Sequence, residues 1–414
     1  LAMRWGYGWK LGPFEQWQAA GWRKVAGLIQ ADIDAGTTGV DAHLPDWVSE
    51  ISAAHEQAGS WSAANGRLSP RPNLPVYQRQ YQPVRLLGEG IDTGKTVHET
   101  DAIRLWSLHN DVLIASLKTK MGVIDTGVVE GLNQALDKAE SGFEGLVIWQ
   151  PQGPFSAGAN LKAAAEAIQQ GDYDSVRALV QGFQEVNLRM RYAGVPSVAA
   201  VRGLALGGGL ELAMHASRRV AHLESYMGLV EAGVGLLPAG GGLATLALQV
   251  NADTAAGDTW PLMEKRYKQV AMGQVAGSAL EAREMGYLRP EDLIVLHEHE
   301  LLHAAHGMIR SLGAAGYRPP LADSTFSAAG DVGIATMKML LVNMLEGHFI
   351  SGHDFDIGAR IATVICGGPI DRGTPVNERW LHHLEREHFL ALCAMPKTQE
   401  RIAHMLKTGK PLRN

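Results

Sequence analysis

Short apolar runs alternate with helical periodicity through the middle of the chain, beginning near Trp106. The runs "VLIASLK" at 112–118 and "GLVIWQ" at 145–150 have the length and apolar content of buried strands. Between them, apolar residues recur at spacings that place them on one helical face: Val128, Val129, Leu132, Ala135, Leu136 and Ala139. Strands that alternate with helices in this way predict an α/β arrangement.

The regions on either side have different patterns. Six of the ten tryptophans lie in the first 61 residues, and prolines at positions 70, 72, 75 and 83 then mark a boundary. We therefore expect a small helical unit over 1–66, an extended linker over 67–105 and the α/β core over 106–290. Long amphipathic segments at 292–313, 333–349 and 377–395 predict a helical region over 291–414.

Charge and cysteine content narrow the class of ligand and the compartment. The chain has 37 Lys and Arg against 43 Asp and Glu, a net charge of −6 without a long basic run, which favours a small molecule over nucleic acid. The only cysteines, Cys366 and Cys393, lie in apolar surroundings, so we expect buried thiols in a reducing compartment.

The sequence also bears on location and completeness. No apolar run approaches the ~18 residues of a membrane span, and the N-terminus lacks the pattern of a secretion signal. We therefore expect a cytoplasmic protein that does not contact membranes. Because the chain begins with Leu1 in what reads as the middle of a domain, we expect a fragment of a longer polypeptide.

The stretch "GLALGGGLELAMHASRRV" at 203–220 carries the first candidate chemistry. Three consecutive glycines predict a tight turn between a strand and a helix whose first turn holds Glu211. Backbone N–H groups at such a turn can receive an anion or a developing oxyanion. The dinucleotide fingerprint does not fit, because its sixth position from Gly207 is Leu212. A phosphate-loop mimic, "EGIDTGKT", has Glu89 in place of the first required glycine.

A second small-residue turn stands upstream in "PFSAGANLK", at Ala157, Gly158 and Ala159. Two such turns side by side would let one N–H from each converge on a single carbonyl oxygen. A second carboxylate, Glu231, follows Glu211 by 20 residues (231 − 211), again among apolar residues. The two carboxylates are candidates for a general acid and a general base. The alternative is that each only stabilises a helix dipole.

A zinc-peptidase pattern must be weighed against this interpretation. "HELLH" places His299, Glu300 and His303 at the spacing of a zinc-binding helix, although no third ligand can be assigned. We interpret "WLHHLEREH" at 380–388 and "SGHDFD" at 351–356 as solvent-exposed polar stretches.

The segments "PFSAGANLK", "PSVAAVRGLALGGGLELAM" and "GLVEAGVGLLPAGGG", in this order and spacing, resemble the enoyl-CoA hydratase/isomerase (crotonase) family over about 106–290. The resemblance implies a spiral of ββα units. It also implies that the N–H groups of Ala159 and Gly208 form an oxyanion hole for a thioester carbonyl. In hydratases of the family Glu211 would activate water and Glu231 would supply a proton.

Further residues follow from the same resemblance. It implies that Lys162 lies near the phosphates of CoA, and that Asn160 and Arg202 replace the family's common aspartate and asparagine. The implied activity is hydration of trans-2-enoyl-CoA in fatty acid β-oxidation, with enoyl-CoA isomerisation as the alternative. An acyl-CoA thioester is then the substrate, and we expect neither a metal nor a nicotinamide cofactor.

The ends of the chain carry a second resemblance. "AMRWGYGWKLGPFEQWQAAG" resembles the closing helical part of 3-hydroxyacyl-CoA dehydrogenases, and "PKTQERIAHMLKTGKPLRN" resembles the tail of bacterial fusions of dehydrogenase and crotonase domains. We therefore expect the C-terminal portion of a bifunctional enzyme, with the hydratase half and without the redox half. This leaves room for a homo-oligomer and, in the full-length protein, for a thiolase partner.

Overall fold

The computed structural model describes residues 2–38, 41–83, 85–88, 94–254, 258–322 and 325–414. The chain divides into two compact units, Leu1–Thr93 and Gly94–Asn414. Residues 89–93 of the phosphate-loop mimic lie outside the described residues. Among the residues described, no helix combines the length and the apolar character needed to cross a membrane.

Unit 1 contains a sheet as well as helices. Its helices are α1 (Ala2–Tyr7), α2 (Pro13–Ala20), α3 (Trp22–Asp34), α4 (Trp47–Glu50) and α5 (Pro75–Gln78). Its antiparallel sheet has the order β1 (His55–Glu56), β2 (Gly59–Ser62), β3 (Arg67–Ser69). Trp22, Val48, Ile51 and Ala54 form a small core. The sheet was not predicted, and β3 occupies the start of the expected linker.

Unit 2 is organised around a mixed sheet of eight strands. Its strands are β4 (Lys95–Glu99), β5 (Ile103–Ser107), β6 (Leu113–Leu117), β7 (Leu146–Trp149), β8 (Ser197–Leu206), β9 (Arg218–Gly228), β10 (Val275–Ala276) and β11 (Leu293–Val295). The order is β10-β9-β8-β7-β6-β5-β4, and β11 also pairs with β9. Strands β6 to β9 run parallel, so their carboxyl ends lie at one edge. Because β4 and β5 belong to this sheet, the end of the expected linker is part of the folded unit.

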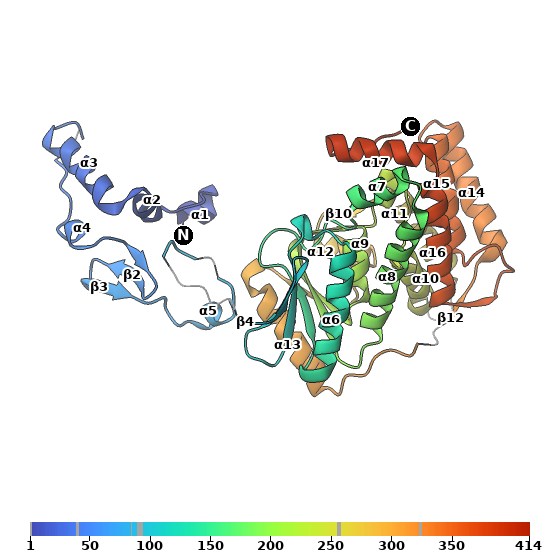
Figure 1. The fold of residues 1–414 in the computed structure, drawn as a ribbon, viewed down its shortest axis with the longest axis horizontal. Helices are drawn as coiled ribbons and strands as arrows, with labels where there is room; N and C mark the ends of the chain where they lie inside the picture. The colour runs from blue at the N-terminus through green and yellow to red at the C-terminus, as the bar shows by residue number, and fades with distance from the viewer. Residues whose placement is uncertain (1, 39–40, 84, 89–93, 255–257, 323–324) are drawn as a thin grey trace. The chain divides into compact units, whose positions relative to one another are not determined.

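The helices of unit 2 connect and cover these strands (Figure 1). They are α6 (Thr126–Gly142), α7 (Leu161–Gln169), α8 (Tyr173–Arg191), α9 (Gly208–His215), α10 (Gly242–Asp253), α11 (Trp260–Ala271), α12 (Ala279–Glu284), α13 (Leu301–Ala314), α14 (Gly330–Glu346), α15 (Gly352–Ile365), α16 (Glu378–Cys393) and α17 (Pro396–Thr408). Short 3-10 turns are η1 (Lys120–Gly122), η2 (Glu231–Val234) and η3 (Glu298–Glu300), and a small ribbon joins β12 (Thr325–Ser327) to β13 (Pro375–Asn377).

The C-terminal helices pack back onto the α/β core. Helices α14, α15 and α16 lie side by side, and α17 contacts α7 and η2 (Figure 1). Helix α16 also contacts α8 and α10. The region expected as a separate helical segment therefore forms part of the walls around α9 and α10.

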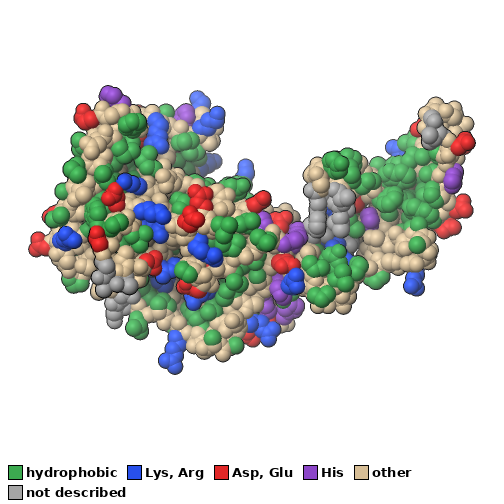
Figure 2. Space-filling view, turned by 180° about the vertical axis from the view of Figure 1, so that it is seen from behind, with side chains coloured by type: hydrophobic (Ala, Val, Ile, Leu, Met, Phe, Trp, Pro, Cys, Tyr) green, Lys and Arg blue, Asp and Glu red, His purple; other side chains and the backbone are tan. Residues whose placement is uncertain are grey.

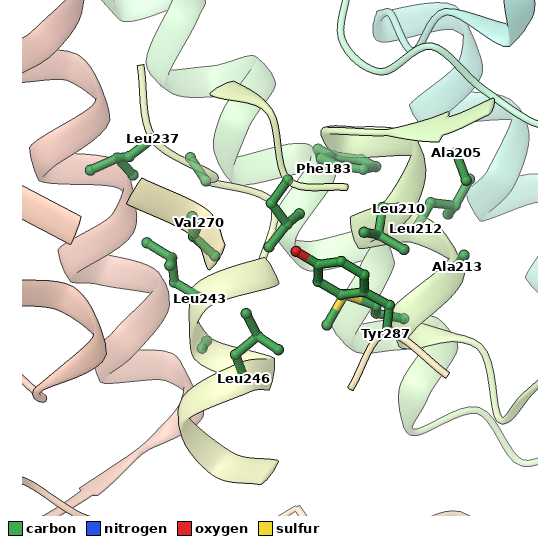
Figure 3. Close-up of a cluster of buried hydrophobic side chains, with 14 of the residues drawn as sticks. Phe183, Ala205, Leu210, Leu212, Ala213, Leu237, Leu243, Leu246, Val270 and Tyr287 are labelled. Carbon is green, nitrogen blue, oxygen red and sulfur yellow. The ribbon is translucent and has the colours of Figure 1, made fainter. Parts of the chain in front are cut away.

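One continuous core fills unit 2. Figure 3 shows part of it, where Phe183 from α8, Leu210 and Leu212 from α9, and Leu243 and Leu246 from α10 come together. Tyr287 directs its hydroxyl into this cluster (Figure 3), and its side chain is 1% exposed. On the face seen in Figure 2, Lys and Arg side chains are interspersed with Asp and Glu.

Several predicted elements are confirmed. The runs at 112–118 and 145–150 contain β6 and β7, and the six residues of the predicted helical face are buried on α6. The segment at 377–395 contains α16, and most of the segment at 333–349 lies in α14, which begins three residues earlier than predicted. Both cysteines are free and buried.

Other predictions were wrong. The segment at 292–313 begins with strand β11 and becomes helical only afterwards. The stretches interpreted as solvent-exposed contain fully buried polar side chains: Glu385 is 0%, His382 3% and His353 1% exposed. Some of their polar atoms have partners on other elements, as His353 Nε2 does at 3.0 Å from Thr398 Oγ1, whereas both ring nitrogens of His382 have no hydrogen-bond partner among the described residues.

Candidate active site

The three glycines at 207–209 differ in backbone conformation and in the space around them. Gly207 has φ 52° and ψ −128°, a conformation that side chains rarely adopt, and it caps α9. A Cβ on Gly209 would lie 2.6 Å from Ser156 Cβ and 2.7 Å from the Ser156 carbonyl oxygen, too close for either atom. A Cβ on Gly208 would meet only ordinary contacts, 3.4 Å from Phe183 Cε1 and 3.6 Å from the Ala159 nitrogen. Gly207 therefore makes the turn, Gly209 packs closely against Ser156, and Gly208 lies near Ala159.

The two small-residue turns meet at the carboxyl edge of the sheet. The loop after β7 runs along the end of β8, where Ser156 N–H donates to the Leu204 carbonyl and Leu206 N–H donates to the Ser156 carbonyl, both at 3.0 Å. In the described part of the chain, neither Ala159 N–H nor Gly208 N–H donates to another protein group. The two N–H groups predicted to form an oxyanion hole thus belong to neighbouring loops, as that prediction requires.

Glu211 is held by the loop before α10. Its Oε1 accepts hydrogen bonds from Gly240 N–H and Gly242 N–H, both at 2.8 Å, and the residue is 3% exposed. Burial raises the pKa of Glu211 to about 7, while the two N–H donors act in the opposite direction. The carboxylate is therefore fixed in position and changes its charge near neutral pH.

Glu231 lies at the start of η2 and is differently supported. Its Oε2 is shielded from solvent and, among the residues described, has no hydrogen-bond partner. A Cβ on Gly207 would lie 3.0 Å from Glu231 Oε1, so the second carboxylate stands beside the glycine turn. Burial, reinforced by the charge of Glu211, raises the pKa of Glu231 well above its ordinary value. Glu231 therefore keeps its proton to higher pH than Glu211.

A third buried carboxylate, Glu385 on α16, was missed from the sequence. Its oxygens accept from Gly241 N–H and Ala244 N–H, each at 2.9 Å, and from Gln184 Nε2 at 3.3 Å. Burial and the charge of Glu211 raise the pKa of Glu385 well above its usual range. Glu211 and Glu385 thus bind alternate N–H groups of the same glycine loop. Helical spacing was the available signal, because Glu385 follows the buried Leu381 by four residues.

The remaining predicted residues lie on the approach to the two turns. Lys162 is exposed on the first turn of α7, with its Nζ 3.8 Å from Glu166 Oε1. Asn160 caps this helix through Oδ1, which accepts from Ala163 N–H at 3.2 Å. Asparagine thus performs the capping role that an aspartate could fill.

Arg202 has a structural task beside the first turn. Its guanidinium donates to the carbonyls of Pro151 at 3.0 Å and Gly153 at 3.3 Å, in the loop that leads to Ala159. Arg202 also lines an open pocket of about 700 Å³, together with Glu224 and Tyr226. That pocket is not lined by either predicted catalytic carboxylate.

The zinc-peptidase pattern gathers no third ligand in the described residues. His299 lies in η3 and His303 in α13, and His299 Nε2 is 3.6 Å from Glu298 Oε1. Among described residues, three metal-binding side chains come together only at His215, Glu378 and His382.

The arrangement can polarise a carbonyl oxygen and move protons beside it. Two N–H groups face one region, with one carboxylate that ionises near neutral pH and another that keeps its proton longer. Such a combination suits addition or proton transfer next to a thioester or a similar carbonyl.

Comparison with solved structures defines the class of fold. An enoyl-CoA hydratase from Bacillus halodurans has a TM-score of 0.50, covering 73% of this chain and 99% of that chain, at 17% sequence identity. Unit 2 therefore has the crotonase fold, as the sequence predicted.

Sequence comparison then gives the family. Residues 112–266 match the family described as "Enoyl-CoA hydratase/isomerase". A relative from Bacillus subtilis named "Probable 3-hydroxyacyl-CoA dehydrogenase" is 34% identical over 420 residues, which cover 100% of this chain and 51% of the relative. A Rickettsia felis relative named "Putative fatty acid oxidation complex trifunctional enzyme" is 29% identical over 262 residues, covering 61% of this chain and 31% of the relative. Residues 112–266 thus form an enoyl-CoA hydratase/isomerase domain, and the chain spans about half the length of the first relative.

Proposed function

We propose that this chain is an enoyl-CoA hydratase, which adds water across the 2,3 double bond of a trans-2-enoyl-CoA in fatty acid β-oxidation. The observation that supports it most is the difference between the two carboxylates. Glu211 becomes ionised near neutral pH, whereas Glu231, with an unpartnered Oε2, keeps its proton longer. One can accept a proton while the other delivers one.

In the proposed reaction, Ala159 N–H and Gly208 N–H donate to the thioester carbonyl oxygen. Ionised Glu211 removes a proton from water, and the water oxygen forms a bond to C3. The π electrons of the double bond move toward the carbonyl oxygen, where the two N–H groups stabilise the negative charge. Glu231 then delivers its proton to C2 and becomes ionised. The product is a 3-hydroxyacyl-CoA, and return of the proton from Glu211 to Glu231 restores the site.

This reaction requires no nicotinamide and no metal in the bond-forming steps. The proposal assigns no dehydrogenase activity to this chain, although one relative carries that name. Lys162 is proposed to contact the CoA phosphates. Association with a thiolase, self-association and a cytoplasmic location stay predictions from the sequence.

The test is loss of the enoyl-thioester absorbance when the full chain meets crotonyl-CoA or a longer 2-enoyl-CoA. Glu211→Gln and Glu231→Gln keep the size of the side chains and remove the acid-base function. Each should lower turnover by about a hundredfold or more, the usual contribution of a positioned acid or base. Glu130→Gln is the matched control, because Glu130 is exposed on α6, and its activity should equal that of the parent chain.

The isomerase alternative gives a different result in the same assay. A chain that cannot hydrate any 2-enoyl-CoA, but that generates the conjugated absorbance from a 3-enoyl-CoA, would be an isomerase. Retention of most hydration by either Gln variant would contradict the two-carboxylate mechanism.

A further inference from the structure

Three buried polar side chains beneath the proposed active site come together from two distant helices. His215 is 1% exposed on α9, and Glu378 and His382 are each 3% exposed on α16. One ligand atom from each lies within 4.8 Å of the others. Neither the family match nor the hydration mechanism uses these side chains, so the cluster calls for its own explanation.

The two imidazoles have nitrogens without partners. His215 Nδ1 lies 2.7 Å from the Glu211 carbonyl oxygen, to which it can only donate, so Nε2 carries a lone pair. His215 Nε2 and both ring nitrogens of His382 have no hydrogen-bond partner among the described residues. Buried polar atoms are nearly always paired, so three unpaired nitrogens in one place point to a missing partner.

Both Nε2 atoms face the same point. A Cβ on Gly241 would lie 2.7 Å from His215 Nε2 and 2.7 Å from His382 Nε2. Gly241 has φ +101°, so a side chain at this position is disfavoured by the backbone as well as by the imidazoles. The absence of a side chain at Gly241 thus leaves room beside the Nε2 atoms of both histidines.

Glu378 supplies the negative charge of the cluster. Arg191 Nη1 donates to Glu378 Oε1, and Tyr192 Oη donates to Glu378 Oε2 at 2.7 Å. A carboxylate has about four lone-pair positions, so these two bonds leave further positions for a cation. They also orient the carboxylate, as outer partners of metal ligands commonly do.

We propose that His215, Glu378 and His382 bind one structural Zn²⁺ ion. Two imidazole nitrogens and one carboxylate oxygen are a known set of three protein ligands for zinc, in which a water takes the fourth tetrahedral position. Zinc bonds of ~2.0–2.2 Å require small inward movements of the three side chains. This proposal departs from the expectation of no metal, and it does not depend on the hydratase assignment.

The ion would join the two helices that hold the glycine loop. Helix α9 carries Glu211 and α16 carries Glu385, whose oxygens bind N–H groups between Gly240 and Ala244. The Zn²⁺ ion would fix the ends of this arrangement, and no step of the reaction passes through it. Arg191 would stay paired with Glu378, so this one carboxylate would offset only part of the charge of the ion.

The test uses the full chain without a histidine tag, freed of metal by a chelator and then titrated with Zn²⁺. Elemental analysis after removal of loose metal should give one zinc per chain, and Co²⁺ in its place should give the visible absorption of a tetrahedral site. His382→Gln and Glu378→Gln should each lose the bound ion. The matched control is the double variant His299→Gln/His303→Gln, which removes the HELLH histidines and should keep it.

Thermal unfolding of the parent chain tests the site without any variant. Added Zn²⁺ should raise the unfolding temperature of the metal-free chain by a few degrees, because the ion binds the folded state. Failure of the parent chain to retain zinc, together with an unchanged unfolding temperature, would overturn the proposal. The proposal would also be overturned if the HELLH double variant lost the ion while His382→Gln and Glu378→Gln retained it. The chain can hydrate enoyl-CoA whether or not it binds zinc, so a failure of the zinc proposal can be distinguished from a failure of the hydratase proposal.

Discussion

The surroundings of Glu211 and Glu231 differ although both carboxylates are shielded from water. Glu211 Oε1 receives two backbone N–H groups from the loop before α10, whereas Glu231 Oε2 has no partner in the described chain. Two like charges at close range repel, and the charge of Glu211 adds to burial in raising the pKa of Glu231, while backbone N–H groups lower the pKa of both carboxyls. The comparison teaches that two residues of the same type can hold their protons differently because of their surroundings.

The largest effect expected from this difference lies in the pH dependence of hydration. Glu211 must be ionised to accept a proton, and its pKa is about 7. The value of kcat/KM should therefore fall by about 50-fold between pH 7 and pH 5, and its slope should approach tenfold per pH unit well below the pKa. At high pH, activity should fall again as Glu231 loses its proton.

Steady-state kinetics across pH 5 to 10 with crotonyl-CoA measure both limbs. In the residual activity of Glu231→Gln, the upper limb should disappear because glutamine does not titrate, and the lower limb should stay near pH 7 because Glu231 is uncharged while Glu211 ionises. Persistence of the upper limb would show that a group other than Glu231 loses its proton at high pH.

A smaller effect is expected on the free energy of unfolding, which should depend on the protonation of Glu231. The folded-state pKa of Glu231 is raised above the ordinary value of 4.5. Its contribution to stability is therefore fully present below about pH 4.5 and is lost as pH rises through the folded-state pKa. Glu231→Gln does not titrate, so it should be more stable than the parent chain at pH 8. The advantage should shrink toward pH 5.

Thermal unfolding at the two pH values, with Glu130→Gln as the exposed control, checks this prediction. The control should follow the parent chain at both values. Equal pH dependence of Glu231→Gln and the parent chain would show that Glu231 titrates normally in the folded state.

The smallest effect should come from Lys162, outside the buried pair. Its side chain is 78% exposed, so screening limits any interaction with a CoA phosphate to about 1 kcal/mol or less. Lys162→Ala should raise KM for crotonyl-CoA by no more than about fivefold and leave kcat unchanged. Lys338→Ala, exposed on α14, is the control. A change in kcat would show that Lys162 influences the chemical step.

The part of this site that could be predicted from the sequence is the part formed by local motifs. The glycine triplet follows a strand and opens a helix, so its turn could be read from spacing and composition alone. Ala159 stands in a similar turn after the neighbouring strand, and parallel strands bring both turns to one edge. The two carboxylates also stood out, since each interrupts an apolar run.

The part that could not be predicted depends on contacts between distant segments. His382 and Glu385 lie in a stretch whose polar composition is typical of solvent-exposed helices. They are buried because α16 packs on α8 and α10, and this contact between distant segments cannot be predicted from the local sequence pattern. Strand β4 was missed for a related reason: its residues are mostly exposed, and it is ordered by pairing with β5.

The hydrogen bonds from Glu385 also bear on where this catalytic module ends. The family match stops at residue 266, yet a side chain 119 positions later (385 − 266) satisfies two N–H groups at the start of α10. A chain shortened to the matched segment would leave those donors unpaired, at a cost of about 1–3 kcal/mol each. The segment that matches the family is therefore shorter than the segment needed to satisfy the hydrogen bonds of the site. A fusion protein that reuses this domain would have to include its C-terminal helices.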